Sequence, residues 1–349
     1  KPLPYFLDAL EADIDAHADL NTKSLTTATI NKLYAHTKHS SLTAQGTAVD
    51  ILKDGDVFEL ANPLCDLQAD LKLNLADAEH FIHSDSLMNQ VLGTAKGTLK
   101  AKARLDDITS QRWERISGNA RLALKDLDVI WQDSLLAQAQ ALDLDLALGK
   151  KVVARNLTAE GKLHFDALHA RLLSSNIEAV IPSGTLTGNA TLNLRDTTAI
   201  PSLACTFDLA ELTANMDTIH AHLMAPKGQA SLAPSKRDGA KPRLEAALAA
   251  TTLQANMGKE IALSTNQFDL SARAVYNKDA ENMLLQWNPR LQFKLINGDV
   301  DYAPLGTTLD IPLIDFTYSN RVFRIDTSRI DLGNSDFSLA HGFDGQPYC

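Results

Sequence analysis

Aromatic residues and long apolar runs are scarce in this sequence. Only 6% of its 349 residues are Phe, Trp or Tyr, although 45% are hydrophobic, with Leu and Ala the main contributors. A compact core normally uses large rings to fill its volume, whereas a sheet lined with Leu and Ala has less need of them. No apolar run approaches the roughly 20 residues that a membrane-spanning helix needs. The composition therefore favours an apolar surface built from short aliphatic side chains.

Basic residues and cysteines are also few. Lys and Arg number 33 against 43 Asp and Glu, which gives a net charge of −10 at pH 7. Phosphate binding requires clustered Lys and Arg, so the acidic balance argues against a nucleic-acid backbone or an anionic lipid surface as the main partner. Cys65, Cys205 and Cys349 are far apart, and their odd number excludes a fully paired disulfide framework. We expect two buried free thiols and a terminal one.

Recognisable catalytic motifs are absent from the sequence. It contains no serine nucleophile elbow, no P-loop and no dinucleotide fingerprint. A zinc site needs three or four convergent ligands, and neither carboxylates nor cysteines complete any of three close histidine pairs. These pairs are His220 with His222, His36 with His39, and His80 with His83. We predict solvent-facing histidines, and a protein that is not an enzyme and has no cofactor or metal.

A nine-residue strand pattern occurs twice, at Gly118–Asp126 and at Gly188–Asp196. Each copy has an initial Gly, small or aliphatic residues at every second position, and a charged end. Period-two alternation places one face of a strand in an apolar environment and the other in water. Similar alternation recurs along the chain, for example in Leu142–Leu148, where Asp143 and Asp145 form the wet side. On the order of twenty strands follow at the spacing of roughly 8–15 residues that is typical of antiparallel meanders.

A few segments depart from this alternation. Ser84–Leu92, which begins with the capping residues Ser-Asp-Ser and is followed by Gly93, predicts a short helix. Pro4–Leu10 and Ser110–Ile116 suit one or two helical turns. The Pro-, Gly- and Lys-rich segment 225–242 predicts a mobile loop. Helix is therefore expected to be a minor component.

The pattern predicts an all-β chain, a long and strongly twisted antiparallel sheet rolled into an open groove with an apolar interior and a few short helices. Residues 1–349 are expected to form one continuous body, a fragment of a longer protein. One-sided strands can be covered by a second sheet, by closure of their own sheet, or by a ligand or membrane. A closed barrel of twenty-odd strands would enclose a lumen that Leu and Ala cannot fill. Stacked sandwiches and an open trough both remain compatible with the periodicity.

Several stretches resemble strands of the bacterial AsmA-like proteins. Pro4–Asp15 resembles the Leu-Asp-Ala-Asp-Leu motif of that family, and the paired Gly-x-Ala-x-Leu-x-Leu strands, Leu142–Leu148 and Arg329–Phe337 are similar to its other strands. The likeness spans essentially the whole chain. The family, with its relatives of the TamB type and the bridge-like lipid transfer proteins, implies a periplasmic β-groove along which phospholipid moves between membranes. It also implies a membrane helix at one end, which we expect outside this sequence, and no catalytic residue.

The cost of exposing acyl chains to water explains what such a groove would do. Each acyl CH₂ exposed to water costs about 0.8 kcal/mol, so that two bare chains cost more than about 10 kcal/mol. A continuous lining of Leu and Ala removes that barrier without a tight site that would trap the lipid. We expect the lining to include Leu122, Leu124, Leu142, Leu144, Leu146, Leu148, Leu163, Phe165, Leu192 and Leu194. A Leu192→Asp substitution should then impair lipid binding and leave folding largely intact.

The resemblance implies phospholipid transport between the inner and outer membranes, in support of outer-membrane integrity. The expected partners are phospholipid acyl chains, the membranes at the ends of the full-length protein, and other envelope proteins. An alternative is a non-enzymatic assembly or scaffold factor for outer-membrane biogenesis. A third interpretation, an enzyme or glycan binder on a β-solenoid, would require regular coils of roughly 20–30 residues with stacked Asn or aromatic ladders. The strand spacing is irregular and such ladders are absent from the sequence.

Overall fold

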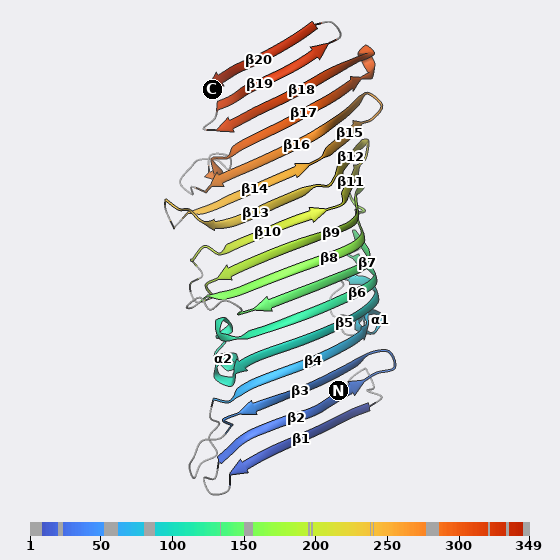
Figure 1. The fold of residues 1–349 in the computed structure, drawn as a ribbon. Coiled ribbons are helices and arrows are strands. Elements are labelled where there is room, and N and C mark those ends of the chain that lie inside the picture. The colour runs from blue at the N-terminus through green and yellow to red at the C-terminus, as the bar shows by residue number, and fades with distance from the viewer. Residues whose placement is uncertain are drawn as a thin grey trace. The chain divides into compact units, whose positions relative to one another are not determined.

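The computed structural model shows an antiparallel sheet of twenty strands with only short helices (Figure 1). The prediction of an all-β, twisted antiparallel sheet is therefore confirmed. The structure describes residues 9–19, 24–51, 62–79, 88–132, 134–149, 156–194, 196, 198–237, 239, 241–276, 286–319, 322–332 and 335–344. The chain divides into two compact units. Unit 1 comprises Lys1–Asp133, Ala137–Phe165 and Asn189–Thr197, and unit 2 comprises Ser134–Leu136, Asp166–Gly188 and Thr198–Cys349.

Unit 1 is built from strands that pair in chain order. Its first six strands are β1 (Ala9–Asp19), β2 (Ser24–His36), β3 (Ser41–Val49), β4 (Leu64–Asn74), β5 (Met88–Arg104) and β6 (Ser117–Trp131). Each pairs antiparallel with the next, and a short turn closed by a hydrogen bond from the Thr37 N–H to the Ser40 carbonyl oxygen joins β2 to β3. Most of β7 (Leu135–Leu148), the first part of β8 (Leu157–Leu172) and the end of β9 (Ile177–Leu192) also belong to this unit. Short helices α1 (Leu75–Glu79), α2 (Leu105–Thr109) and η1 (Trp113–Arg115) lie at strand ends.

Unit 2 contains the remaining strands. Some of them lie end to end, so that together they pair like one long strand with a break in the middle. The strands are β10 (Ser202–Leu209), β11 (Glu211–Met216), β12 (Ile219–Met224), β13 (Lys227–Pro234), β14 (Pro242–Ala250), β15 (Thr252–Met257), β16 (Ile261–Val275), β17 (Arg290–Tyr302), β18 (Thr307–Ser319), β19 (Val322–Leu332) and β20 (Ser335–Asp344), with η2 at Ala303–Leu305. Strands β14 and β15 pair with successive halves of β16, and β13 and β12 pair in turn with β14 and β15. From β16 to β20 each strand pairs with the next.

The breaks between coupled strands fall on one line across unit 2, which we call the crease. Along it the apolar alternation changes parity: in β17 the apolar positions are Leu291, Phe293 and Leu295 before the crease, and Gly298 and Val300 after it. The Cδ2 atom of Leu295 would lie 2.5 Å from a Cβ placed on Gly298, so that both residues are on the same face. The sheet is therefore able to bend without exchanging its two faces.

Buried side chains collect along the crease. They are Leu209, Pro226, Ala250, Thr265, Leu295 and Ile311. Asn297, between the two halves of β17, has φ = 51°, a left-handed conformation that Asn tolerates better than most residues. In unit 1, Gly93 (φ = 124°) and Asp126 (φ = 52°) mark an irregularity of the same kind in the β5–β6 pairing. Burial in unit 2 is therefore concentrated along the crease.

The helix predicted at Ser84–Leu92 is wrong where the structure describes it. Met88 begins β5 and pairs with Trp131, and Val91 pairs with Val129 of β6. Gly93, which the sequence presents as a helix C-cap, instead carries the positive φ of the β5 irregularity. Cross-strand pairing outweighs the local capping signal here. Residues 84–87 lie outside the described residues, as does most of Pro4–Leu10, whose last two residues belong to β1.

The loop predicted at 225–242 is also wrong over about half of its length. Lys227–Pro234 forms β13, which pairs with β10 on one side and with β14 on the other. Its prolines sit before the strand or at its ends, where a missing N–H is tolerated. Of the other local predictions, the helical turn at Trp113 is confirmed as η1. The second repeat strand is confirmed for Gly188–Leu192, where β9 ends, four residues short of Asp196.

Thr265 is the most buried polar side chain of the crease, with 2% of its surface exposed. Its Oγ1 lies 2.9 Å from the Ile296 carbonyl oxygen and 3.0 Å from that of Gln267, both acceptors for its proton, and it accepts the Gln267 N–H at 3.3 Å. Thr265→Val keeps the shape but leaves these backbone groups unsatisfied, so we expect a loss of about 1–3 kcal/mol in the free energy of unfolding. Urea denaturation measures it. Thr98→Val, at an exposed position of β5, is the control, and equal stability of the two variants would contradict the role of Thr265.

Candidate functional site: the apolar face

The strands of unit 1 present alternating residues to one side, in a register that sets large side chains opposite small ones. Leu67 of β4 lies opposite Gly46 of β3 and Ala101 of β5. Leu122 of β6 lies opposite Gly97 of β5. Because a Gly or Ala neighbour leaves room for each Leu, the side chains interdigitate along the sheet. The result is a smooth aliphatic surface, which we call the apolar face of unit 1.

All ten residues predicted to line the groove belong to unit 1. Leu122 and Leu124 lie on β6, Leu142 to Leu148 on β7, Leu163 and Phe165 on β8, and Leu192 at the end of β9, with Leu194 just beyond it. Phe165 is buried, with 6% of its surface exposed, whereas about 40% of the surface of Leu146, Leu148 and Leu194 is exposed. The remaining six side chains are half-buried.

Polar contacts fix the relative register of β6, β7 and β8. Arg121 Nε donates to Asp145 Oδ1 at 2.9 Å, which aligns β6 with β7. The Gly149 N–H donates to the Thr158 carbonyl oxygen at 2.9 Å, which aligns β7 with β8. With alternation along each strand, this register puts Leu122 and Leu124 on the face opposite to the ion pair. The even-numbered leucines of β7 follow them onto that face.

A glycine in β8 confirms which side the β7 leucines occupy. A Cβ on Gly161 would lie 3.1 Å from the Cδ2 atom of Leu146, so the two residues share a face. Alternation then carries Leu163 and Phe165 to the same side as Leu146. The structure thus brings the predicted residues of β6, β7 and β8 together on one surface. Leu192 and Leu194 lie on a neighbouring part of the unit, at the end of β9.

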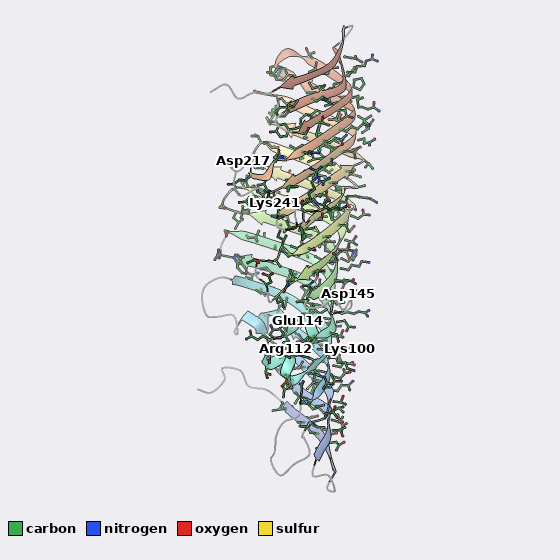
Figure 2. The ribbon with its side chains drawn as sticks, turned by 90° about the vertical axis from the view of Figure 1, so that its left-hand side faces the viewer. Lys100, Arg112, Glu114, Asp145, Asp217 and Lys241 are labelled. Atoms are coloured by element: carbon green, nitrogen blue, oxygen red, sulfur yellow. The ribbon has the colours of Figure 1, made fainter. Side chains whose placement is uncertain are left out.

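The opposite face of unit 1 is charged. Lys102 of β5 lies 3.6 Å from Asp66 of β4, and Arg121 pairs with Asp145 as described above. Lys100 and Asp145, both labelled in Figure 2, belong to this face. A hollow of about 970 Å³ on this face is lined mainly by hydroxyl and charged groups. Asp143 and Asp145 are exposed there, which confirms the predicted wet side of β7.

Unit 2 has an apolar face as well, and it carries rings that the sequence analysis did not anticipate. One directly opposed row crosses six strands and consists of Phe207, Gly228, Leu248, Leu270, Phe293 and Phe316. Neighbouring rings extend it into a cluster, which we call the aromatic row: Phe268, Phe293, Phe316, Tyr318 and Phe323. The sequence carries one sign of this cluster: Phe and Tyr occur at matching alternate positions in adjacent strands. That match can be recognised only when the strand register is known.

The polar face of unit 2 holds a hydrogen-bonded chain that crosses four strands. His169 Nε2 lies 2.7 Å from Glu178 Oε1, Asn215 Nδ2 donates to Glu178 Oε2 at 3.3 Å, and Asn215 Oδ1 lies 2.9 Å from His220 Nδ1. Hydrogen bonds from His169 and Asn215 lower the pKa of Glu178 below 4.5. His222, the other member of the predicted pair, contacts Glu211 at 2.7 Å. Within the described ranges no three His, Cys, Asp or Glu side chains are arranged to hold a metal ion.

The lowered pKa of Glu178 predicts a pH dependence of stability. A carboxylate with a depressed pKa in the folded state stabilises the protein above its unfolded pKa, 4.5, and that contribution is lost as the pH falls through the folded value. We therefore expect wild type to be more stable than Glu178→Gln above pH 4.5 and the difference to shrink below it. Chemical denaturation at pH 6, 5, 4 and 3 measures the difference. A constant difference at all four values would show that Glu178 is not the titrating group.

The two described cysteines lie on the apolar faces. Both are half-buried, so the prediction that they are buried thiols is wrong. Cys65 of β4 lies opposite Ala103 of β5, and Cys205 of β10 lies opposite Ala230 of β13. The reason is that no further layer of described residues covers these positions. Cys349 lies outside the described residues.

Comparison with protein-family models, with curated proteins and with solved structures finds no match for this chain. Among the described residues, the helices are too short to cross a membrane.

Proposed function

We propose that this chain binds phospholipid acyl chains on its apolar faces, as part of a periplasmic AsmA-like β-groove that moves lipid between the inner and outer membranes. One observation carries the proposal: large aliphatic side chains stand exposed on the face of the sheet opposite to the ion pairs. In unit 1 these are Leu10, Ile14, Leu42, Leu67, Leu99, Leu146 and Leu148. Exposed apolar patches of this extent are typical of binding surfaces.

The same exposure bears on the two architectures compatible with the sequence. In a stacked sandwich a second sheet would bury these leucines, as the inner faces of sandwiches are buried. Here 64% of the surface of Leu10 and 61% of that of Ile14 are exposed. Within the described residues of unit 1, the face is open to a partner. An open sheet is therefore favoured over a sandwich.

The side chains that line the apolar face of unit 1 suit lipid transport better than tight lipid binding. Several leucines lie opposite Gly or Ala, as Leu122 lies opposite Gly97, so the lining there is built from small and aliphatic side chains. An acyl chain on such a lining avoids the cost of about 0.8 kcal/mol for each CH₂ in water, and meets no deep pocket that would hold it. The charged opposite face stays in water. This division of the two faces supports a passage for hydrocarbon in preference to a recognition site for a polar ligand.

Native mass spectrometry of the purified protein tests the proposal. We expect phospholipid to remain bound in mild conditions. A photo-reactive amino acid at Leu146 should crosslink to that lipid, whereas the same group at Asp145, on the opposite face, should not. A folded protein without lipid, and without crosslinks at either position, would refute the proposal and support the assembly or scaffold alternative.

A further inference from the structure

The aromatic row of unit 2 sets that unit apart from the aliphatic lining of unit 1. The Phe268 and Phe293 ring centroids lie 5.6 Å apart with their planes at 76°, and Phe293 lies 5.9 Å from Phe316. Phe316 stacks on Phe323 at 6.0 Å, and Tyr318 contacts Phe323 at 4.6 Å. Five rings from four consecutive strands, β16 to β19 (orange to red in Figure 1), therefore touch in sequence.

The aromatic row runs diagonally across β16 to β19, from the crease to the outer end, where β18 ends and β19 begins. Phe268 lies opposite Leu295 at the crease, Phe293 lies opposite Phe316 one step farther out, and Tyr318 lies opposite Phe323 another step out. Exposure follows the same direction: Leu295 is 3% exposed, and Phe323 is 51% exposed. Phe268, at the inner end of the row beside the buried Leu295, is half-buried, and Phe323 is exposed at the outer end.

The chemistry of this face selects a hydrocarbon. The polar side chains closest to it are buried at the crease and already bonded within the sheet: Thr265 bonds to backbone groups, and Ser328 Oγ accepts the Asp315 N–H at 3.4 Å. The Thr265 and Ser328 hydroxyls are therefore engaged within the sheet, and the phenyl rings of the row offer only carbon to a ligand. Tyr318, at the outer end, is the row's one member with a hydroxyl. An amphiphile therefore fits with its chain over the phenyl rings and its polar end at Tyr318.

We propose that the aromatic row is a retention site for one acyl chain, whose methyl end lies at Phe268 and whose polar end lies at Tyr318 and Phe323. The inference rests on the proposed function and refines it: unit 1 lets a chain pass, and unit 2 holds it. Rigid rings lose little conformational freedom when they bind and offer more contact area than Leu or Ala. A chain on the aromatic row is therefore bound more tightly than one on the aliphatic face.

Fluorescence titration with cis-parinaric acid, an 18-carbon fatty acid, tests the site. We expect one tight site and several weaker ones in wild type. The double variant Phe293→Leu/Phe316→Leu keeps the face apolar and should weaken the tight site about tenfold, since two ring contacts are worth roughly 1.4 kcal/mol together. A matched ring-to-leucine change on the charged face of unit 1, Tyr34→Leu, should alter the tight site less than twofold. Thermal unfolding establishes that both variants fold.

The orientation has a separate test that keeps the rings intact. Phe323→Trp adds a fluorophore at the outer end, and its emission, taken as the difference from wild type, should be quenched more by stearic acid with a nitroxide at carbon 5 than at carbon 16. Equal or reversed quenching would overturn the orientation. Should the double variant unfold, this measurement and the single variant Phe293→Leu decide the proposal.

The outcomes separate the two proposals. If wild type binds no fatty acid, both fail. If wild type binds and Phe293→Leu/Phe316→Leu binds equally well, the retention site is wrong and the lipid-binding face stands. If sedimentation shows a wild-type dimer that the double variant dissolves, and no fatty acid binds, the rings cover a second copy of the chain and the retention site is again wrong.

Discussion

Leu67→Asp will slow lipid transfer by about tenfold or more, whereas Gln68→Asp, one residue along β4, will leave it unchanged. Leu67 lies on the apolar face between Gly46 and Ala101, and Gln68 lies on the charged face opposite Lys100. The two variants introduce the same carboxylate into the same strand on opposite sides of the sheet. They differ only in whether hydrocarbon must pass the charge.

The size of the effect follows from the serial nature of the proposed groove. In the proposed transport a lipid passes every strand of the face in turn, so one barrier limits the whole rate. Contact between a buried polar group and hydrocarbon costs about 2–7 kcal/mol. The open surface of Leu67, 38% exposed, lets water keep part of the carboxylate solvated, which reduces the barrier to the low end of that range. About tenfold is therefore a conservative expectation.

Transfer of a fluorescent phospholipid between donor and acceptor vesicles measures the rate, and native mass spectrometry measures the lipid retained. Circular dichroism and thermal unfolding check that both variants fold like wild type. Equal transfer by Leu67→Asp and wild type would show that lipid does not cross this face of β4. A loss in Gln68→Asp of the same size would show that the effect is one of charge or folding, unrelated to the face.

Alternation in the sequence predicted the strands well because it is a local property. Apolar and polar residues alternate from Leu10 to Leu20, most of which forms β1, and from Cys65 to Leu75, which corresponds to β4 (Leu64–Asn74). The crease could not be found this way, because it depends on changes of parity inside strands. Asn297 and Asp126, both at positive φ, separate runs of opposite parity, and a search for such changes would have found them.

Strand register was the larger gap, and it hid the aromatic row. A slip of one residue exchanges the two faces of a strand, but a slip of two keeps every Leu on the apolar side, so the apolar pattern cannot decide between such registers. The charged face supplies the missing information. Lys227 pairs with Asp208 at 3.0 Å, and Lys294 lies opposite both Asp269 and Asp315.

These rows of opposed charges contribute more to the specificity of the strand register than to the stability of the fold. An exposed ion pair is worth about 0–1 kcal/mol, so the pairs hold little of the folding energy. A two-residue slip of β17, however, would separate Lys294 from both its opposed carboxylates. Alternating charge on the wet side thus fixes a register that the repetitive apolar side leaves free. The rings of the aromatic row meet only in that register.

Gly228→Ala will destabilise the protein by about 1–3 kcal/mol, the usual cost of overpacking a well-filled site. Gly228 lies in β13 between Phe207 of β10 and Leu248 of β14, and the Phe207 ring lies directly over it. A Cβ at this position would overlap two ring atoms of Phe207 and lie 2.8 Å from the Ala247 carbonyl oxygen. The ring must leave its place in the apolar row, and the backbone contact allows no easy shift.

The expected loss of stability in Gly228→Ala is opposite in sign to the usual effect of replacing Gly by Ala in a strand. Ala in a strand interior is normally more stable than Gly by about 0.5–1 kcal/mol, because the unfolded chain then has less freedom to lose. Gly239→Ala, where no atom lies within 4 Å of the new Cβ, is the matched control and should stay within about 0.5 kcal/mol of wild type. Urea denaturation midpoints compare the variants.

A double-mutant cycle identifies the cause. If the clash with the ring is responsible, Gly228→Ala will cost much less in a Phe207→Leu background than in wild type, because the smaller side chain can move aside. Additive costs would place the strain in the backbone near Ala247 instead. A Gly228→Ala variant as stable as Gly239→Ala would mean that the Phe207 ring does not lie over β13, and that the six-strand apolar row of unit 2 is interrupted at its second residue.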